Sequence, residues 1–183
     1  MKYIFFVSIG MIIHAYFLYP ASIYIIAIFR GRKQKTYDYT PSVTVIITAY
    51  NEEKQIRKKI ENTLSLSYPP GKLQIIVASD GSTDRTTEYI KIFSEKGVEP
   101  IDILNRGGKE NAQRESLKQA KGEIIVFTDV ATMLDPEGIE QIVSNFADPE
   151  IGCASSEDRV IGKNGKVSGE NFYVRYEMWL RRL

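Results

Sequence analysis

The chain has 183 residues, with 24 lysines and arginines against 23 aspartates and glutamates. This length suits one soluble domain with an anchor and leaves no room for a second full domain. The near-neutral charge gives no electrostatic support for nucleic acid as a partner. The single cysteine, Cys153, excludes an internal disulfide and a cysteine-rich zinc site, and it suits a reducing compartment.

The amino-terminal segment is apolar. No Asp, Glu, Lys or Arg occurs in residues 3–29, a run longer than the roughly 20 apolar residues that cross a bilayer as a helix. We therefore expect a transmembrane anchor over residues 1–30, kinked at Pro20, in preference to a cleaved signal peptide, whose apolar core is shorter. Four basic residues follow within residues 30–35 and only Lys2 precedes. This asymmetry predicts that the rest of the chain is cytoplasmic.

A basic juxtamembrane linker is expected over residues 31–41, where the composition turns polar. Beyond it, β-branched and apolar runs have the composition of buried parallel strands, and helical periodicity lies between them. The predicted strands cover residues 43–48, 73–78, 100–104 and 123–128, and the helices contain residues 56–64, 84–94, 109–120 and 139–146. This alternation predicts an α/β domain with a mostly parallel sheet over residues 42–168, which binds its ligands at the carboxyl ends of the strands.

The last part of the chain has a different pattern. It predicts a strand near residues 152–161, a Gly-Lys-Asn-Gly turn at residues 162–165 and an amphipathic helix over residues 169–183. Phe172, Tyr176 and Trp179 recur on one face of that helix. Such a helix suits a membrane surface, and a helix packed in an ordinary core is the alternative.

Polar residues follow the first two predicted strands. Tyr50 and Glu52 lie in the first of these loops and can face a ribose or a base, whereas Asn51 is expected to cap the following helix. Helix capping alone is the competing interpretation of that loop. In the second loop Asp84 suits a helix cap, which leaves Asp80 free. Its carboxylate can accept hydrogen bonds from the imide N–H of a uracil or from ribose hydroxyls.

The third and fourth loops carry charge suited to phosphates. Two glycines allow close backbone approach within residues 105–109, where Arg106 and Lys109 add positive charge for a diphosphate. A flexible surface turn is the alternative. Asp129 ends the fourth strand, and its carboxylate suits Mg²⁺ or Mn²⁺, because Asp135 is the natural cap of the next helix.

Together these loops resemble the family 2 glycosyltransferases, and the resemblance extends from about Pro41 to the end of the chain. It rests on four segments: Thr48-Ala-Tyr-Asn-Glu-Glu53, Ser79-Asp-Gly-Ser-Thr-Asp84, Gly107-Gly-Lys109 and Phe127-Thr-Asp129. The resemblance implies a glycosyltransferase A-type fold, with Asp80 contacting the base, Lys109 in the donor pocket and Asp129 as the first acid of a D-x-D-like metal motif. Ala131 departs from that motif, since many members have Asp or Asn there.

The resemblance implies transfer of a hexosyl unit from a UDP-sugar to a glycan or lipid-linked acceptor, with inversion. Residues 171–182 resemble a segment of membrane-bound bacterial members that build extracellular polysaccharides. The family's downstream acidic base has no match. Glu157 and Asp158 lie within a predicted strand and are interpreted as structural, which leaves Asp158 as a weak candidate base. We therefore expect a chain truncated relative to the family, with poor turnover. A donor-binding fragment without activity and a sugar nucleotidyltransferase are the alternatives.

Overall fold

The computed structural model describes residues 2–30, 39–156 and 176. The chain divides into two compact units, one formed by Met1–Lys35 with Ser155–Leu183 and the other by Thr36–Ala154. Glu157, the candidate base Asp158 and the predicted turn lie outside the described residues. The predicted domain boundaries at residues 30, 41 and 168 stay predictions.

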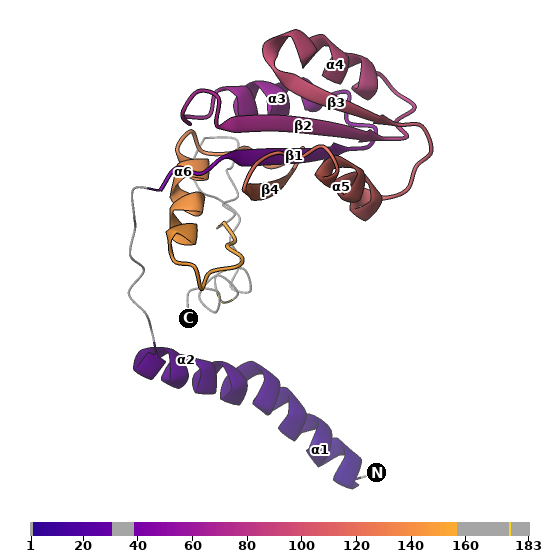
Figure 1. Cartoon of the computed structure of the whole chain (residues 1–183). Coiled ribbons are helices and arrows are strands. Elements are labelled where there is room, and N and C mark those ends of the chain that lie inside the picture. The colour runs from indigo at the N-terminus through magenta and orange to yellow at the C-terminus, as the bar shows by residue number, and fades with distance from the viewer. Residues whose placement is uncertain (1, 31–38, 157–175, 177–183) are drawn as a thin grey trace, which may run out of the picture. The chain divides into compact units, whose positions relative to one another are not determined.

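The amino-terminal unit contains one helical stretch formed by α1 (Lys2–Ile13), η1 (His14–Leu18) and α2 (Tyr19–Arg30). η1 is a π-helix, in which the Tyr19 N–H donates to the carbonyl of His14. Proline has no N–H and its ring crowds the preceding turn, so the regular α-helix is interrupted directly before Pro20. The helix bends there (Figure 1), where the sequence predicted a kink.

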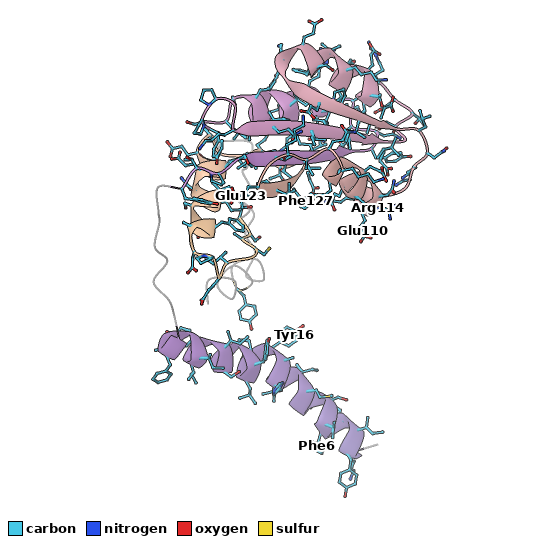
Figure 2. All side chains as sticks on the ribbon, viewed as in Figure 1. Phe6, Tyr16, Glu110, Arg114, Glu123 and Phe127 are labelled. Carbon is cyan, nitrogen blue, oxygen red and sulfur yellow. The ribbon has the colours of Figure 1, made fainter. Side chains whose placement is uncertain are left out.

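This helix presents apolar side chains to its surroundings. Lys2–Ile26 is, among the described residues, the one helix long and apolar enough to cross a membrane, with a mean hydropathy of 1.7. Its large side chains, Phe6 among them, project outward from the helix (Figure 2). The predicted apolar helix is therefore present.

The second unit is built on a parallel sheet. Its strands are β1 (Val43–Ala49), β2 (Leu73–Asp80), β3 (Val98–Ile103) and β4 (Ile124–Asp129), in the spatial order β3-β2-β1-β4. All four coincide with predicted strands, within two residues at each end. The predicted α/β fold with a parallel sheet is thus confirmed.

Helices cover both faces of this sheet (Figure 1). The α-helices are α3 (Ile56–Leu64), α4 (Thr86–Ile92), α5 (Lys109–Leu117) and α6 (Gly138–Val143), with short 3₁₀ helices η2 (Phe93–Lys96) and η3 (Ser144–Ala147). α3 and α4 lie on one face and α5 on the other. Alternation along the strands sends Val45 and Ile47 into the main core with Ile56 and Ile60 of α3, whereas Ile46 belongs to the opposite face.

The order of the strands creates the site. The chain moves outward from β1 to β2 and β3, then returns through α5 to place β4 on the other side of β1. Ligands bind at such a switch point, beyond the carboxyl ends of the strands. The register pairs Thr48 of β1 with Asp129 of β4, which brings the first and fourth loops together.

The described residues after η3 differ from the prediction. A strand was predicted near residues 152–161. The structure describes residues 152–156 of this range, and they lie in no strand, so the prediction is wrong there. Of the helix predicted over residues 169–183, only Tyr176 is described, and it is helical.

Candidate functional site

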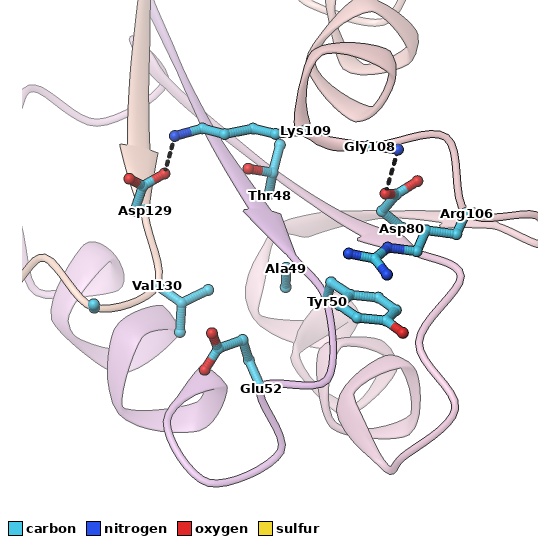
Figure 3. A pocket seen from close by; sticks show the side chains of 11 residues that line it. Thr48, Ala49, Tyr50, Glu52, Asp80, Arg106, Gly108, Lys109, Asp129 and Val130 are labelled. Atoms are coloured by element: carbon cyan, nitrogen blue, oxygen red, sulfur yellow. Dashed lines mark hydrogen bonds and ion pairs between the residues drawn. The ribbon is translucent and has the colours of Figure 1, made fainter.

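A pocket of about 380 Å³ opens at the carboxyl ends of the strands (Figure 3). Residues from all four predicted loops line it, including each of the six proposed from the sequence for donor binding. The lining residues are Thr48, Ala49, Tyr50, Glu52, Asp80, Arg106, Gly108, Lys109, Asp129, Val130 and Ala131.

The first and second loops are joined through Asn51. This residue has a left-handed backbone conformation with a φ of 53°, which asparagine tolerates better than most residues. Its amide oxygen accepts a hydrogen bond from the Thr83 N–H at 2.8 Å, and its own N–H donates to the Ser82 hydroxyl at 3.2 Å. The prediction that Asn51 caps the following helix is therefore wrong, because its side chain joins the two loops instead.

A second junction between these loops is centred on Asp84. Its carboxylate accepts hydrogen bonds from the Glu53 N–H at 3.1 Å and from the N–H and hydroxyl of Thr86 at 3.0 and 2.6 Å. Burial raises the pKa of Asp84, but these hydrogen bonds outweigh that effect and hold the pKa below its ordinary value. The predicted cap is wrong in its position, because Arg85 is the cap residue of α4 and its side chain makes no capping hydrogen bond. Asp84 lies one residue earlier, where it bonds to Thr86 and also fixes the first loop.

Asp80 holds the third loop against the end of β2. Its two carboxylate oxygens accept hydrogen bonds from the backbone N–H groups of Gly107 at 2.8 Å and Gly108 at 2.7 Å, and the side chain is buried. Gly81 permits this close approach, since it has a φ of 65° and a Cβ there would lie 2.7 Å from the backbone nitrogen of Arg106. Asp80 therefore positions a loop, a role that the sequence did not indicate.

Two cationic side chains of the third loop face the pocket. The Arg106 guanidinium lies 3.8 Å from the centre of the Tyr50 ring, which is a cation–π geometry. The Lys109 ammonium lies 2.6 Å from a carboxylate oxygen of Asp129, and both side chains are more than half exposed. Figure 3 shows this ion pair beside Thr48, at the end of β1.

Sequence reasoning missed Lys59. This lysine of α3 is fully buried, and its ammonium donates hydrogen bonds to the Thr128 hydroxyl and the Thr132 carbonyl. Burial lowers its pKa to about 8, an effect that the charge of Asp129 partly offsets. A signal was available, because Lys59 lies three residues after Ile56 and so shares the buried face of the helix.

The donor set of the pocket fits a divalent cation only in part. Among the described residues no group of three or more His, Cys, Asp or Glu side chains is arranged to hold a metal ion. Asp129 and Glu52 nevertheless bring two carboxylates to the pocket, and Mg²⁺ is often held by one or two carboxylates with substrate phosphates and water. These residues fit a cation that the bound substrate helps to hold.

Comparison with known proteins decides the class. The profile described as glycosyl transferase family 2 matches residues 44–180, about three quarters of the chain. The chain belongs to this family. The family and enzyme class predicted from the four loop segments are therefore confirmed, and the nucleotidyltransferase alternative is disfavoured.

Curated relatives of this family 2 chain include polysaccharide synthases. The poly-beta-1,6-N-acetyl-D-glucosamine synthase of Staphylococcus aureus (strain COL) is 31% identical over 135 residues, which cover 71% of this chain and 32% of the relative. The corresponding enzyme of Staphylococcus epidermidis is 29% identical over 130 residues, 68% of this chain and 31% of that protein. The chain thus spans about a third of the length of these relatives.

Solved structures agree on the fold. Mannosyltransferase PcManGT from Pyrobaculum calidifontis, in complex with GDP-Man and Mn²⁺, is similar with a TM-score of 0.67 and 30% identity over 76% of this chain and 43% of that one. Staphylococcus aureus TarS 1-349 matches with a TM-score of 0.54 and 21% identity, covering 67% of this chain and 40% of that one. The predicted glycosyltransferase A-type fold is confirmed.

Proposed function

We propose that this family 2 chain binds a UDP-sugar in the pocket and contributes to the transfer of its hexosyl unit, with inversion, to a glycan or lipid-linked acceptor. The observation that carries the proposal is the convergence of Tyr50, Asp80, Arg106, Lys109 and Asp129 from four loops on one pocket. A mixture of cationic, aromatic and carboxylate groups suits a ligand that joins a base, a ribose and a diphosphate.

Each group has a proposed part in donor binding. Tyr50, stacked under Arg106, offers an aromatic surface for the base. Asp80 keeps the N–H-rich third loop in place, and the remaining lone pairs of its carboxylate are available to the base or ribose. Lys109 and Arg106 supply the positive charge that a diphosphate requires.

The transfer step requires a leaving group and a base. In this step the bond from the anomeric carbon to the diphosphate oxygen breaks, the diphosphate leaves with the electron pair, and the acceptor oxygen bonds to that carbon. The cationic side chains of the third loop stabilise the charge that develops on the diphosphate. A divalent cation at Asp129, when bound, would neutralise part of the same charge. The acceptor's proton passes to a general base, for which the sequence offers only Asp158 as a weak candidate.

The relatives support a hexose donor, but they do not decide which nucleotide carries the hexose. The synthase from Staphylococcus aureus is named for an N-acetylglucosamine polymer, which supports a hexosamine donor and a glycan product for this chain. PcManGT holds GDP-Man, so a guanine nucleotide is the competing donor. We retain UDP, because the carboxylate of Asp80 at the strand tip suits the imide N–H of uracil.

We also propose that the helix Lys2–Ile26 anchors the chain in a membrane with the pocket on the cytoplasmic side. Its length and composition support the anchor, and the basic residues after it support the orientation. A membrane-impermeant thiol reagent added to intact cells would test the orientation at Cys153, which is exposed. Labelling without lysis would contradict it.

The donor proposal is tested by titrating the full chain, in detergent, with UDP, GDP, CMP and ADP in the presence and absence of Mn²⁺. We expect UDP to bind most tightly, and Asp129→Ala to remove the gain that Mn²⁺ produces. Equal affinity for the four nucleotides, or a preference for GDP, would contradict the UDP assignment. Membranes containing the chain are then supplied with radiolabelled UDP-N-acetylglucosamine. UDP binding without any product would identify the chain as a donor-binding unit that needs further segments for transfer.

A further inference from the structure

Lys59 has an unusual environment for a lysine. Its side chain is fully buried, yet among the described residues no carboxylate lies within ion-pair distance of its ammonium. Two neutral oxygens accept hydrogen bonds from it, the hydroxyl of Thr128 at 2.9 Å and the carbonyl of Thr132. Lysine is almost never fully buried unless paired, and an apolar side chain of similar volume is often at least as stabilising. Packing alone therefore does not account for a cation at this position.

Asn62 acts on the same segment one turn further along α3. Its amide oxygen accepts a hydrogen bond from the Leu134 N–H at 2.8 Å, and its amide nitrogen donates to the Leu134 carbonyl at 2.9 Å. Residues three apart share one face of a helix, so Lys59 and Asn62 contact the chain at two successive points. Together they hold residues 128–134 at both ends.

The held segment forms one wall of the pocket. Asp129, Val130 and Ala131 lie within residues 128–134 and line the pocket, and a turn closed by the Thr132 N–H and the Asp129 carbonyl at 3.2 Å shapes the segment. The Asp129 carboxylate is more than half exposed, so its own environment restrains it little. Its position therefore depends on how firmly the backbone beneath it is held.

We propose that Lys59 and Asn62 are positioning residues that fix residues 128–134, and with them the Asp129 carboxylate, for binding of a nucleoside diphosphate. The inference deepens the proposed function and rests on it. The buried ammonium contributes in a second way, because its charge attracts the Asp129 carboxylate across a medium that screens it less than water does. Neither residue contacts the pocket itself.

The test compares Lys59→Met and Asn62→Ala with two control variants in the full chain. Thr63→Val removes a buried hydroxyl that bonds within α3, and Ser116→Ala removes one that bonds within α5. We expect both test variants to bind UDP with Mn²⁺ about tenfold more weakly, and both controls to change the affinity by less than about twofold. Equal losses in test and control variants would overturn the proposal, because they would reflect general loosening of the fold.

A double-mutant cycle separates positioning from stability. If Lys59 and Asn62 act through Asp129, then in an Asp129→Ala background their substitution should change UDP affinity by less than about twofold. Losses that add fully to that of Asp129→Ala would contradict the proposal. Should Lys59→Met fail to fold, the Asn62→Ala cycle decides alone.

Hydrogen exchange without ligand distinguishes this inference from the proposed function. In Asn62→Ala the Leu134 amide loses its acceptor, and exchange should quicken over residues 130–134 but not in Thr63→Val. Unchanged exchange in that segment would overturn the positioning role whatever the chain binds. If the wild-type chain binds no nucleotide, the proposed function fails, whereas quickened exchange confined to residues 130–134 would still support the holding contact.

Discussion

Buried charges of opposite sign hold the two walls of the pocket. On one side the carboxylate of Asp80 accepts hydrogen bonds from two backbone N–H groups in residues 106–108. On the other side the ammonium of Lys59 donates to oxygens in residues 128–132. Each charge is satisfied by the loop that it holds, and not by the other charge. Because an unpaired buried polar group is costly, such contacts fix a loop more firmly than exposed ion pairs do.

The charges that face the pocket have the opposite character. Lys109 and Asp129 meet at 2.6 Å, but both are more than half exposed, and exposed ion pairs contribute little to stability. The two side chains can therefore separate and bind a ligand with little loss of free energy. The comparison separates buried charges that build the site from exposed charges that are free to bind.

The largest expected effect on stability is at the buried carboxylate of Asp80. Asp80→Ala removes two charge-assisted hydrogen bonds, so we expect a loss of about 3 kcal/mol in the free energy of unfolding and of about 1 to 3 kcal/mol in UDP binding. Denaturant unfolding and calorimetry measure the two quantities. Asp102→Ala, which removes an exposed carboxylate of β3 paired with Lys91, is the control. A variant of Asp80 no less stable than this control would break the comparison.

The buried ammonium of Lys59 should make the free energy of unfolding depend on pH. Burial lowers the pKa of Lys59 to about 8 from 10.5, so the folded chain releases this proton at a lower pH than the unfolded chain. Between about pH 8 and 10.5 the unfolded chain binds more protons, and stability must rise with pH by up to about 1.4 kcal/mol per unit from this residue. Below pH 8 the contribution is constant and unfavourable.

Unfolding of the wild type and of Lys59→Met across this range isolates the contribution, because the other titrating lysines and tyrosines are common to both. The free energy of unfolding of the wild type relative to the variant should rise from pH 8 to 10.5. A difference that does not change with pH would show that Lys59 titrates normally in the folded chain.

The smallest expected effect on stability is at the exposed pair. Lys109→Met should change the free energy of unfolding by less than about 0.5 kcal/mol, whereas UDP binding should weaken by about 1 to 3 kcal/mol through loss of a charged contact with the diphosphate. Lys118→Met, which breaks the exposed pair with Glu115 on the same helix, serves as the control for both measurements. A large loss of stability in Lys109→Met would remove the distinction between building and binding charges.

Much of the fold was readable from local patterns. Runs such as Val43–Ala49 are rich in β-branched residues and almost entirely buried because both faces of the sheet are covered, and Ile56, Ile60 and Leu64 repeat with the period of a helix. The residues after each strand were readable for a related reason, since parallel strands bring their carboxyl ends to one edge. All six proposed donor-binding residues accordingly line one pocket.

The sequence by itself determined the apolar helix, the order of strands and helices, and the loops that carry Tyr50, Asp80 and Asp129, because each depends on neighbours along the chain. Only the tertiary structure decided the partners across loops. Asn51 joins a second loop instead of capping a helix, and Lys59 supports a segment about 70 residues away. No local pattern specifies such contacts, since the buried donor and its acceptor meet only after the sheet has placed β1 beside β4.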